Sequence, residues 1–330
     1  MSLTQNELAL FHRQGYLVKP GLFIAADLKP LQDALTEIVD QGARELQAIG
    51  KLTNIHADKP FGQRLSSIYL EDSEAGQAIT SRVMGKGCGG YNGSAMLQTI
   101  RHPALLSCIE SLIGPDIVGS SVYRIRPKLP GWDRGEVPWH QDAGYTLAHC
   151  DRHLIVTCWV PLVDATLENG CLHVIPTVHR NGILKHFTGG HAGFLEVPDE
   201  ELPPVEPVPV PMNAGDALLL TNLTPHASFE NRTNQVRWSI DLRYQSANVP
   251  NNVDEDPAAY TPERDPVTMA CYPPKPTSSS ATTATQTARS IPPTNSDNCA
   301  SATKQPALTP PAAAGHHSRS ADTPHKIRHN

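Results

Sequence analysis

The sequence lacks several features that would assign it to a familiar class. Its seven cysteines form no Cys-x-x-Cys pair and are odd in number, which argues against a zinc cluster or a paired disulfide framework and favours a reducing compartment. Basic residues form no stripe and the formal net charge is −6, so we expect no nucleic-acid partner. Neither a Walker sequence nor a Gly-x-Ser-x-Gly elbow occurs.

Long apolar segments are missing too. No run approaches the ~18 residues of a membrane helix, and the first ten residues lack the charged and apolar regions of a signal peptide. We therefore expect a cytoplasmic protein without membrane association.

Aromatic residues disappear near the C-terminus. Residues 273–330 contain no Phe, Trp or Tyr and consist largely of Pro, Ser, Thr and Ala. Such a segment cannot bury enough apolar area to offset the entropy lost on ordering, so we predict a disordered tail. Residues 1–272 then form the folded domain.

Helical patterns occupy the first 116 residues or so. Thr4 and Glu7 form a capping-box signature that opens a short helix, which Gly15 closes. Apolar residues at helical spacing predict a second helix from about 26 to 46, and a third runs from 104 to 113. Residues 50–95 are predicted as loop with at most one short helix.

From about residue 117 the pattern changes to short strands. Segments 154–160 and 217–220 are apolar, and segment 236–244 alternates between apolar and polar residues. Asn169-Gly170 predicts a hairpin between Val163 and residues 172–175. Helices followed by many short strands favour a mainly β fold with α: a jelly roll (double-stranded β-helix, cupin-like) over about 117–246, backed by N-terminal helices.

Three His-x-Asp pairs occur in the chain: His56–Asp58, His140–Asp142 and His149–Asp151. Chance alone predicts roughly one, so context must select among them. His140 lies at the start of the strand region, and residues i and i+2 of an extended segment share a face. A distant His226 would complete a set of two imidazoles and one carboxylate, which suits non-haem Fe(II).

The order of several motifs resembles one family. The motifs are Trp139-His140-Gln141-Asp142, Trp159, residues 168–176 around Asn169-Gly170, Gly215-Asp216, His226-Ala227-Ser228 and Arg237. In this order they are similar, over about residues 5–245, to the phytanoyl-CoA dioxygenase (PhyH-like) family of Fe(II)/2-oxoglutarate oxygenases. The spacing of eleven residues between His226 and Arg237 is the most specific part.

This resemblance implies a site. His140, Asp142 and His226 would bind Fe(II), and Arg237 would bind the far carboxylate of 2-oxoglutarate. Ser228 and Trp159 would line the co-substrate pocket. With O₂ as second co-substrate, the expected reaction hydroxylates a C–H bond of a small or medium metabolite and releases succinate and CO₂. One departure from the family is Pro176-Thr177-Val178-His179 in place of Pro-Gly-Ser-His, which would alter a lid near the pocket.

The charges of the residues agree with this site. Fe(II), one aspartate and 2-oxoglutarate sum to +2 − 1 − 2 = −1, which a guanidinium at Arg237 would neutralise. Two alternatives stay open: a redox-inert cupin-type enzyme, such as a zinc hydrolase or isomerase, gives no role to Arg237, and a non-catalytic jelly-roll binding module would use the histidines structurally. Arg124 and Arg126 precede the site and either contact an anion or form a solvated strand face.

Overall fold

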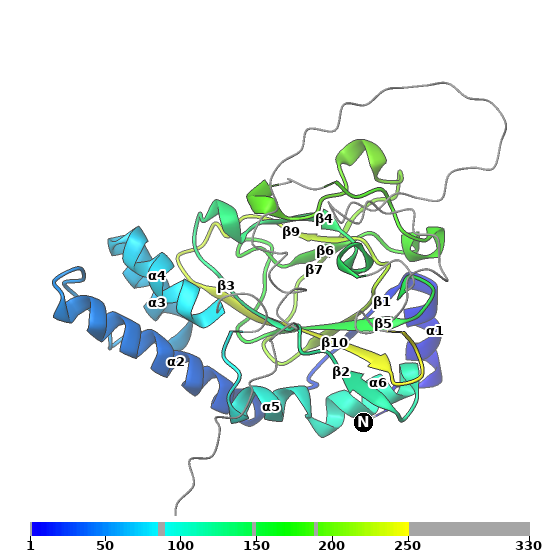
Figure 1. The fold of residues 1–330 in the computed structure, drawn as a ribbon, viewed down its shortest axis with the longest axis horizontal. Coiled ribbons are helices and arrows are strands. Elements are labelled where there is room, and N and C mark those ends of the chain that lie inside the picture. The colour runs from blue at the N-terminus through cyan, green and yellow to red at the C-terminus, as the bar shows by residue number, and fades with distance from the viewer. Residues whose placement is uncertain (1, 85–89, 147–149, 188–190, 251–330) are drawn as a thin grey trace, which may run out of the picture.

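The computed structural model describes residues 2–84, 90–146, 150–187 and 191–250. Two antiparallel sheets face each other, and helices cover the outer face of the larger sheet (Figure 1). This arrangement confirms the predicted jelly roll backed by N-terminal helices. The predicted tail, 273–330, lies outside the described residues.

The larger sheet contains six strands. Its order is β1 (Tyr16–Lys19), β8 (Ala217–Thr221), β5 (Ile155–Pro161), β10 (Arg237–Ser246) and β2 (Ile117–Gly119), with β3 (Arg124–Lys128) also paired to β10. The smaller sheet has the order β4 (Val137–His140), β9 (His226–Ser228), β6 (Leu172–Val174) and β7 (Val208–Val210). From β3 onward the chain passes repeatedly between the two sheets, so residues far apart in sequence meet between them.

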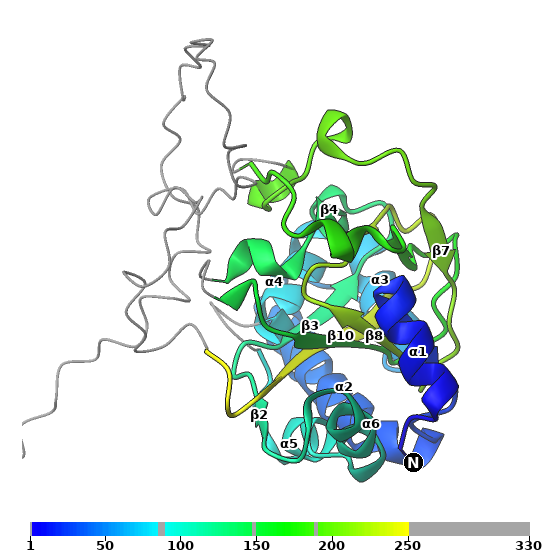
Figure 2. The ribbon, with the colours of Figure 1, turned by 90° about the vertical axis from the view of Figure 1, so that its right-hand side faces the viewer.

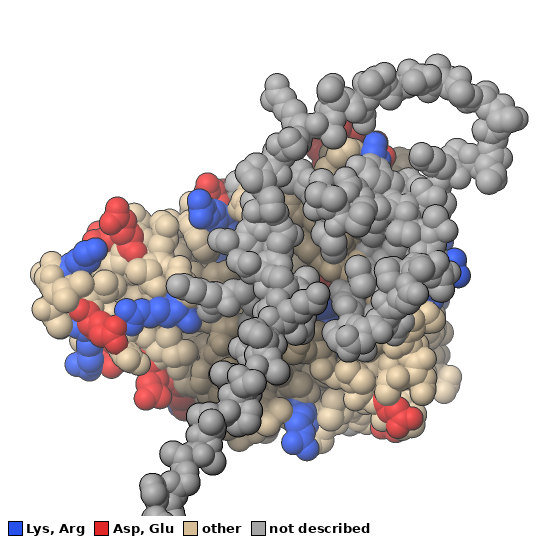
Figure 3. Space-filling model, viewed as in Figure 1, with Lys and Arg blue, Asp and Glu red and all other residues tan. Residues whose placement is uncertain are grey.

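Six helices precede the strand region within the described residues. They are α1 (Gln5–Gln14), α2 (Ala25–Ala48), α3 (Phe61–Glu71), α4 (Ser73–Met84), α5 (Ser94–Ile100) and α6 (Pro103–Ile113). Figure 2 shows α2, α5 and α6 beneath the larger sheet. No helix in the described part of the chain is long and apolar enough to cross a membrane. On the face in Figure 3, acidic and basic side chains are interspersed.

The first helix is capped as predicted. Thr4 Oγ1 accepts a hydrogen bond from the backbone N–H of Glu7, and the Glu7 carboxylate accepts one from the Thr4 N–H. At the other end Gly15 has a φ of 84° and its N–H bonds to the carbonyl of Phe11. Two short-range sequence signals were thus sufficient to fix both ends of this helix.

The prediction of loop for residues 50–95 is wrong, because α3 and α4 lie there. Glycine obscured the helical pattern in the sequence. Gly76 lies within α4, and a Cβ on it would lie 2.6 Å from the Cα of Tyr69 in α3. Glycine is therefore required where the two helices pack closely, whereas in a sequence it indicates a helix break.

The predicted hairpin at Asn169-Gly170 is also wrong. β6 pairs with β7 and β9 in the smaller sheet, whereas Val163 follows β5 of the larger sheet. The two residues instead form a turn between the sheets: Asn169 Oδ1 accepts from the Thr166 N–H at 2.8 Å, and Gly170 has a φ of 81°. A side chain that bonds its own neighbouring backbone makes a turn without pairing two strands.

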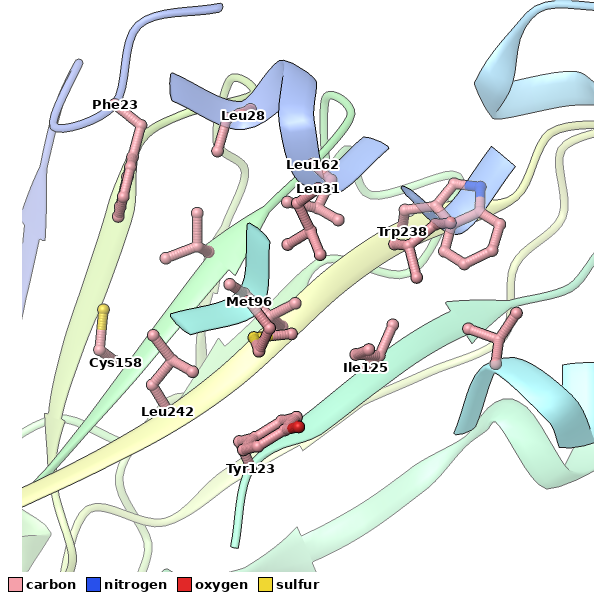
Figure 4. Close-up of a cluster of buried hydrophobic side chains, with 14 of the residues drawn as sticks. Phe23, Leu28, Leu31, Met96, Tyr123, Ile125, Cys158, Leu162, Trp238 and Leu242 are labelled. Carbon is pink, nitrogen blue, oxygen red and sulfur yellow. The ribbon is translucent and has the colours of Figure 1, made fainter. Parts of the chain in front are cut away.

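The apolar core lies between the helices and the larger sheet. Trp238 on β10 stacks on Phe61 of α3 with ring centroids 4.8 Å apart. Figure 4 shows Trp238 and Leu242 on the same face of the strand, among side chains from α2, α5, β3 and β5. The intervening residues of β10 point the other way, into the space between the sheets, where the candidate site lies.

Candidate metal centre and adjoining cavity

Two histidines meet where strands β4 and β9 pair. His140 is the last residue of β4, His226 is the first residue of β9, and the two are direct register partners. Cross-strand partners point to the same side of a sheet, and here the ring centroids are 4.2 Å apart. Both side chains are buried between the two sheets.

Asp142 joins this pair although it is not in a strand. β4 ends at His140, and Asp142 opens the short 3-10 helix η2 (Asp142–Tyr145). Gln141 nevertheless keeps extended backbone angles, φ −112° and ψ 139°, so residues 140 and 142 project to one side. The potential ligand atoms of His140, Asp142 and His226 all lie within 4.8 Å of one another, and no other such group occurs in the described part of the chain.

Backbone carbonyls orient both imidazole rings. His140 Nδ1 lies 2.8 Å from the Pro138 carbonyl oxygen, and His226 Nδ1 lies 3.0 Å from that of Thr224. A carbonyl oxygen only accepts, so each Nδ1 carries a proton, and Nε2 is the ring atom left to bind a metal. Burial, with the neighbouring His226, holds the pKa of His140 well below its ordinary value. A neutral imidazole with a free lone pair is the form that binds metals.

The Asp142 carboxylate is held from two sides. Arg243 Nη2 donates to one oxygen at 2.6 Å, and the Thr157 hydroxyl donates to the other. Burial opposes ionisation, but the charge of Arg243, helped by His226 and His140, leaves the pKa of Asp142 well below its usual range. No sequence pattern indicated a role for Thr157. Arg243 shares the polar face of β10 with Arg237, so the alternation along this strand could have identified it.

The other His-x-Asp pairs are placed differently. His56 belongs to the helical layer, where its Nε2 lies 2.6 Å from a carboxylate oxygen of Glu71. His149 lies outside the described residues. Of the two pairs that the structure describes in full, only His140–Asp142 lies beside His226.

Arg237 is buried in the same cavity and is 1% exposed. Its Nη1 donates to Ser239 Oγ at 2.6 Å, its Nη2 donates to Ser228 Oγ at 3.4 Å, and its guanidinium carbon lies 5.2 Å from the Trp159 ring centroid. The structure thus brings Arg237, Ser228 and Trp159 together, and their binding of a co-substrate stays a prediction. Burial lowers the pKa of Arg237 to about 10, so it is charged at neutral pH. Its Nε is buried and has no hydrogen-bond partner among the described residues.

One cavity connects these groups. It is lined by Arg126, Val137, His140, Thr157, Trp159, Leu172, Leu220, His226, Ala227, Ser228, Arg237, Asp241 and Arg243. The two histidines and Arg237 therefore line the same cavity.

The segment that departs from the resembled family lies elsewhere. Thr177 has a φ of 69°, a conformation that glycine adopts more easily, and its N–H donates to the Gln14 carbonyl at 2.8 Å. His179 Nε2 lies 3.1 Å from the His12 carbonyl oxygen. None of residues 176–179 lines the cavity, so the predicted effect on a lid does not arise through direct contact with that cavity.

Comparison with known proteins now identifies the family. The sequence model of the phytanoyl-CoA dioxygenase (PhyH) family matches residues 11–239. The chain belongs to this family. Members of the PhyH family are Fe(II)/2-oxoglutarate-dependent oxygenases, so the chain is an oxidoreductase of that class.

Relatives in the PhyH family are distant. A phytanoyl-CoA dioxygenase of Arabidopsis thaliana is 27% identical over 254 residues, covering 73% of this chain and 88% of the relative. A methylphosphonate hydroxylase of Gimesia maris is 27% identical over 250 residues, covering 74% and 82%. The solved structure of EvdO2 from Micromonospora carbonacea has a TM-score of 0.50 at 18% identity, covering 78% of this chain and 96% of that chain, and it supports the fold.

Proposed function

We propose that this PhyH-family protein hydroxylates a C–H bond of a small or medium metabolite, with residues 1–272 as the catalytic domain. His140, Asp142 and His226 hold Fe(II), and Arg237 binds the far carboxylate of 2-oxoglutarate beside Ser228 and Trp159. The observation that carries this proposal is that two imidazoles and a buried guanidinium line one cavity, with the ionised Asp142 carboxylate within 4.8 Å of both imidazoles.

The donor set fits the metal. Two imidazoles and one carboxylate are the usual set for non-haem Fe(II) enzymes that leave positions open for other ligands. Backbone carbonyls orient both imidazoles, so each Nε2 is already positioned to bind a metal in the metal-free protein. Arg243 and Thr157 keep Asp142 ionised and fixed.

The guanidinium fits the co-substrate. The buried Nε of Arg237 lacks a partner in the described structure, although an unsatisfied polar group costs about 1–3 kcal/mol. A dicarboxylate would satisfy it and would balance its charge. Ser228 Oγ and the Trp159 ring restrict how the guanidinium can turn, so it would grip the carboxylate in one orientation.

The residues of the chain would bind and orient Fe(II) and 2-oxoglutarate and would shield them from water. When bound, Fe(II) and 2-oxoglutarate supply the oxidising chemistry, in which O₂ is consumed, 2-oxoglutarate yields succinate and CO₂, and one oxygen atom enters the substrate C–H bond. Leu172, Leu220 and Trp159 give the cavity apolar walls, which limit the access of water to the reacting groups.

Anaerobic spectroscopy tests the proposal. Fe(II) and 2-oxoglutarate, added together to metal-free protein, should produce a weak visible charge-transfer band that neither produces alone. Admission of O₂ should then release succinate, and the His226→Ala variant should show neither signal. Retention of zinc with no band would support the redox-inert alternative, and failure to bind any metal would support a binding module.

A further inference from the structure

Strand β3 brings two arginines and a lysine beside the polar face of β10. The two strands are antiparallel, and their register pairs Arg237 with Lys128, Ser239 with Arg126 and Asp241 with Arg124. Register partners point to the same side of a sheet. These three side chains of β3 therefore share a face with the residues of β10 that line the cavity. Burial lowers the pKa of Lys128 to about 6, so Arg124 and Arg126 carry the positive charge of this face at neutral pH.

Arg126 and Asp241 form an ion pair in the cavity wall. Arg126 Nε lies 2.5 Å from Asp241 Oδ2. The other carboxylate oxygen, Oδ1, is buried and has no hydrogen-bond partner among the described residues. The side chain of Asp241 is 8% exposed and that of Arg126 is 23% exposed, so the pair is desolvated on the carboxylate side. A buried carboxylate oxygen without a donor favours a ligand that brings one.

Positive charge exceeds negative charge along this cavity. The charged lining residues, apart from the histidines, are Arg126, Arg237, Arg243 and Asp241, with Asp142 held by Arg243 beside them. They sum to 3 − 2 = +1, and Fe(II) with 2-oxoglutarate adds +2 − 2 = 0. Arg124 adds a further cation nearby, and its one hydrogen bond in the described structure goes to the Tyr123 carbonyl. The loaded site would therefore attract an anion.

Two apolar residues of the cavity lie near Ser228, where the co-substrate is proposed to bind. Val137 and Leu172 are both register partners of Ser228, so they flank the Arg237 end. Beside Arg126 and Asp241 the lining includes the polar residues Arg243 and Thr157, and the ring of Trp159, the register partner of Asp241, is the apolar contact there. A long hydrocarbon chain finds few apolar contacts there, whereas a short polar molecule finds complementary groups.

We propose that Arg126 and Asp241 bind the primary substrate, and that this substrate is a small organic acid with a hydroxyl or amino group near its acid group. The free N–H groups of Arg126 would grip the acid, and Asp241 Oδ1 would accept a hydrogen bond from the neighbouring donor. This proposal rests on the proposed oxygenase function. The acid is a carboxylate, phosphonate or phosphate, because a guanidinium fork recognises all three.

A matched panel of compounds tests the substrate class. Three-to-six-carbon carboxylic acids, phosphonates and phosphates would each be supplied with a hydroxyl, with an amine, and unsubstituted, beside their neutral amides or esters. Succinate release above the substrate-free rate would be measured. Acids that carry a donor should stimulate turnover, and one of the three acid types should do so best. Equal stimulation by neutral esters or by apolar compounds would overturn the proposal.

Two variants then test whether Arg126 and Asp241 recognise the substrate. Arg126→Met should raise the KM of a stimulating acid on the order of 10- to 100-fold, since one charged hydrogen-bonding partner is lost. Asp241→Asn keeps an oxygen toward Arg126 and places an NH₂ group where Oδ1 was. It should therefore raise the KM of acids that carry a hydroxyl or amine, and it should leave the KM of the unsubstituted acids unchanged. Arg82→Met, which breaks an ion pair with Glu45 on the helical layer, is the control for loss of an arginine and should leave these KM values unchanged.

Co-substrate measurements separate the two proposals. If the charge-transfer band and substrate-free succinate release are normal in Arg126→Met while stimulation is lost, both proposals stand. If the KM for 2-oxoglutarate rises instead and the KM of the acid does not, Arg126 belongs to the co-substrate site and the substrate proposal falls. Absence of the band in the unmodified protein would instead overturn the oxygenase proposal itself.

Discussion

The two faces of strand β10 are equally buried but serve different purposes. Trp238, Ile240 and Leu242 face the helices and pack against apolar neighbours, so their burial is favourable in itself. Arg237 and Asp241 face the cavity, where burial is costly unless each polar atom finds a partner. The comparison shows that burial alone does not distinguish core from site, and that on this strand the buried polar atoms without partners lie on the cavity face.

The two cavity-facing atoms without partners, Arg237 Nε and Asp241 Oδ1, lie on the same face of the strand. Each leaves an estimated 1–3 kcal/mol of hydrogen-bonding free energy unrealised in the free protein. Ligands that complete those bonds would recover it. Burial of the apolar face stabilises the fold and offsets the cost of the unsatisfied polar atoms. Substitutions on the apolar face should therefore change folding stability, and substitutions on the cavity face should change binding and turnover.

The largest effect is expected at the metal ligands. His226→Ala removes one of three ligands and should lower Fe(II) affinity and 2-oxoglutarate turnover by about 10³-fold or more. Asp142→Asn keeps the size of the side chain but removes its charge and should have a similar effect. Metal content and succinate release measure function, and thermal unfolding followed by circular dichroism measures the fold. Turnover at the unmodified rate would mean that the ligands are wrongly assigned.

A substitution on the opposite face should affect stability instead. Trp238→Ala removes the stacking on Phe61 and leaves a cavity between sheet and helices, so unfolding should require about 3–5 kcal/mol less free energy. Chemical denaturation measures this change. In the fraction that stays folded at low temperature, the KM for 2-oxoglutarate should not change. A raised KM together with unaltered stability would contradict the division between the two faces.

Arg237→Ala should act mainly on the co-substrate. The variant loses the cation that faces the dicarboxylate, and the KM for 2-oxoglutarate should rise about 100-fold, with a smaller change in kcat. Arg237→Lys restores the charge without the planar fork and should recover only part of this loss. If the Ala and Lys variants have equal KM values for 2-oxoglutarate, the planar shape of the guanidinium matters more than its charge. If neither substitution alters the KM, the co-substrate binds elsewhere.

Local sequence signals predicted much of the fold. The capping box of α1, the apolar periodicity of α2 and the alternation along β10 each depend on residues close in sequence, and all three correspond to observed elements. The errors arose where tertiary packing decides. Gly76 allows α3 and α4 to approach closely, and Asn169-Gly170 turns the chain between two sheets, and neither fact is visible without the neighbours.

The candidate site divides in the same way. Motif order drew attention to His140, Asp142, His226 and Arg237. The structure places both histidines and Arg237 on one cavity and Asp142 within 4.8 Å of the histidines, and the roles of these residues stay predictions. Arg243 and Thr157 were missed because a supporting hydrogen bond depends on three-dimensional neighbours. Thr157 in particular lies in the middle of the apolar segment that became β5, where its hydroxyl carries no sequence signal.

The smallest effect among these predictions concerns the arginine that supports the metal ligand. Arg243 donates to Asp142 at 2.6 Å without contacting the histidines, so it acts through the carboxylate. Arg243→Met should weaken metal affinity by about 10- to 100-fold, as loss of an outer hydrogen bond usually does. Anaerobic titration with Co(II), monitored by its visible spectrum, measures this directly. Saturating metal should restore most of the turnover in Arg243→Met but not in His226→Ala. If metal does not restore it, Arg243 contacts the substrate or co-substrate itself, and the polar face of β10 would then hold a second anion-binding arginine rather than a support for Asp142.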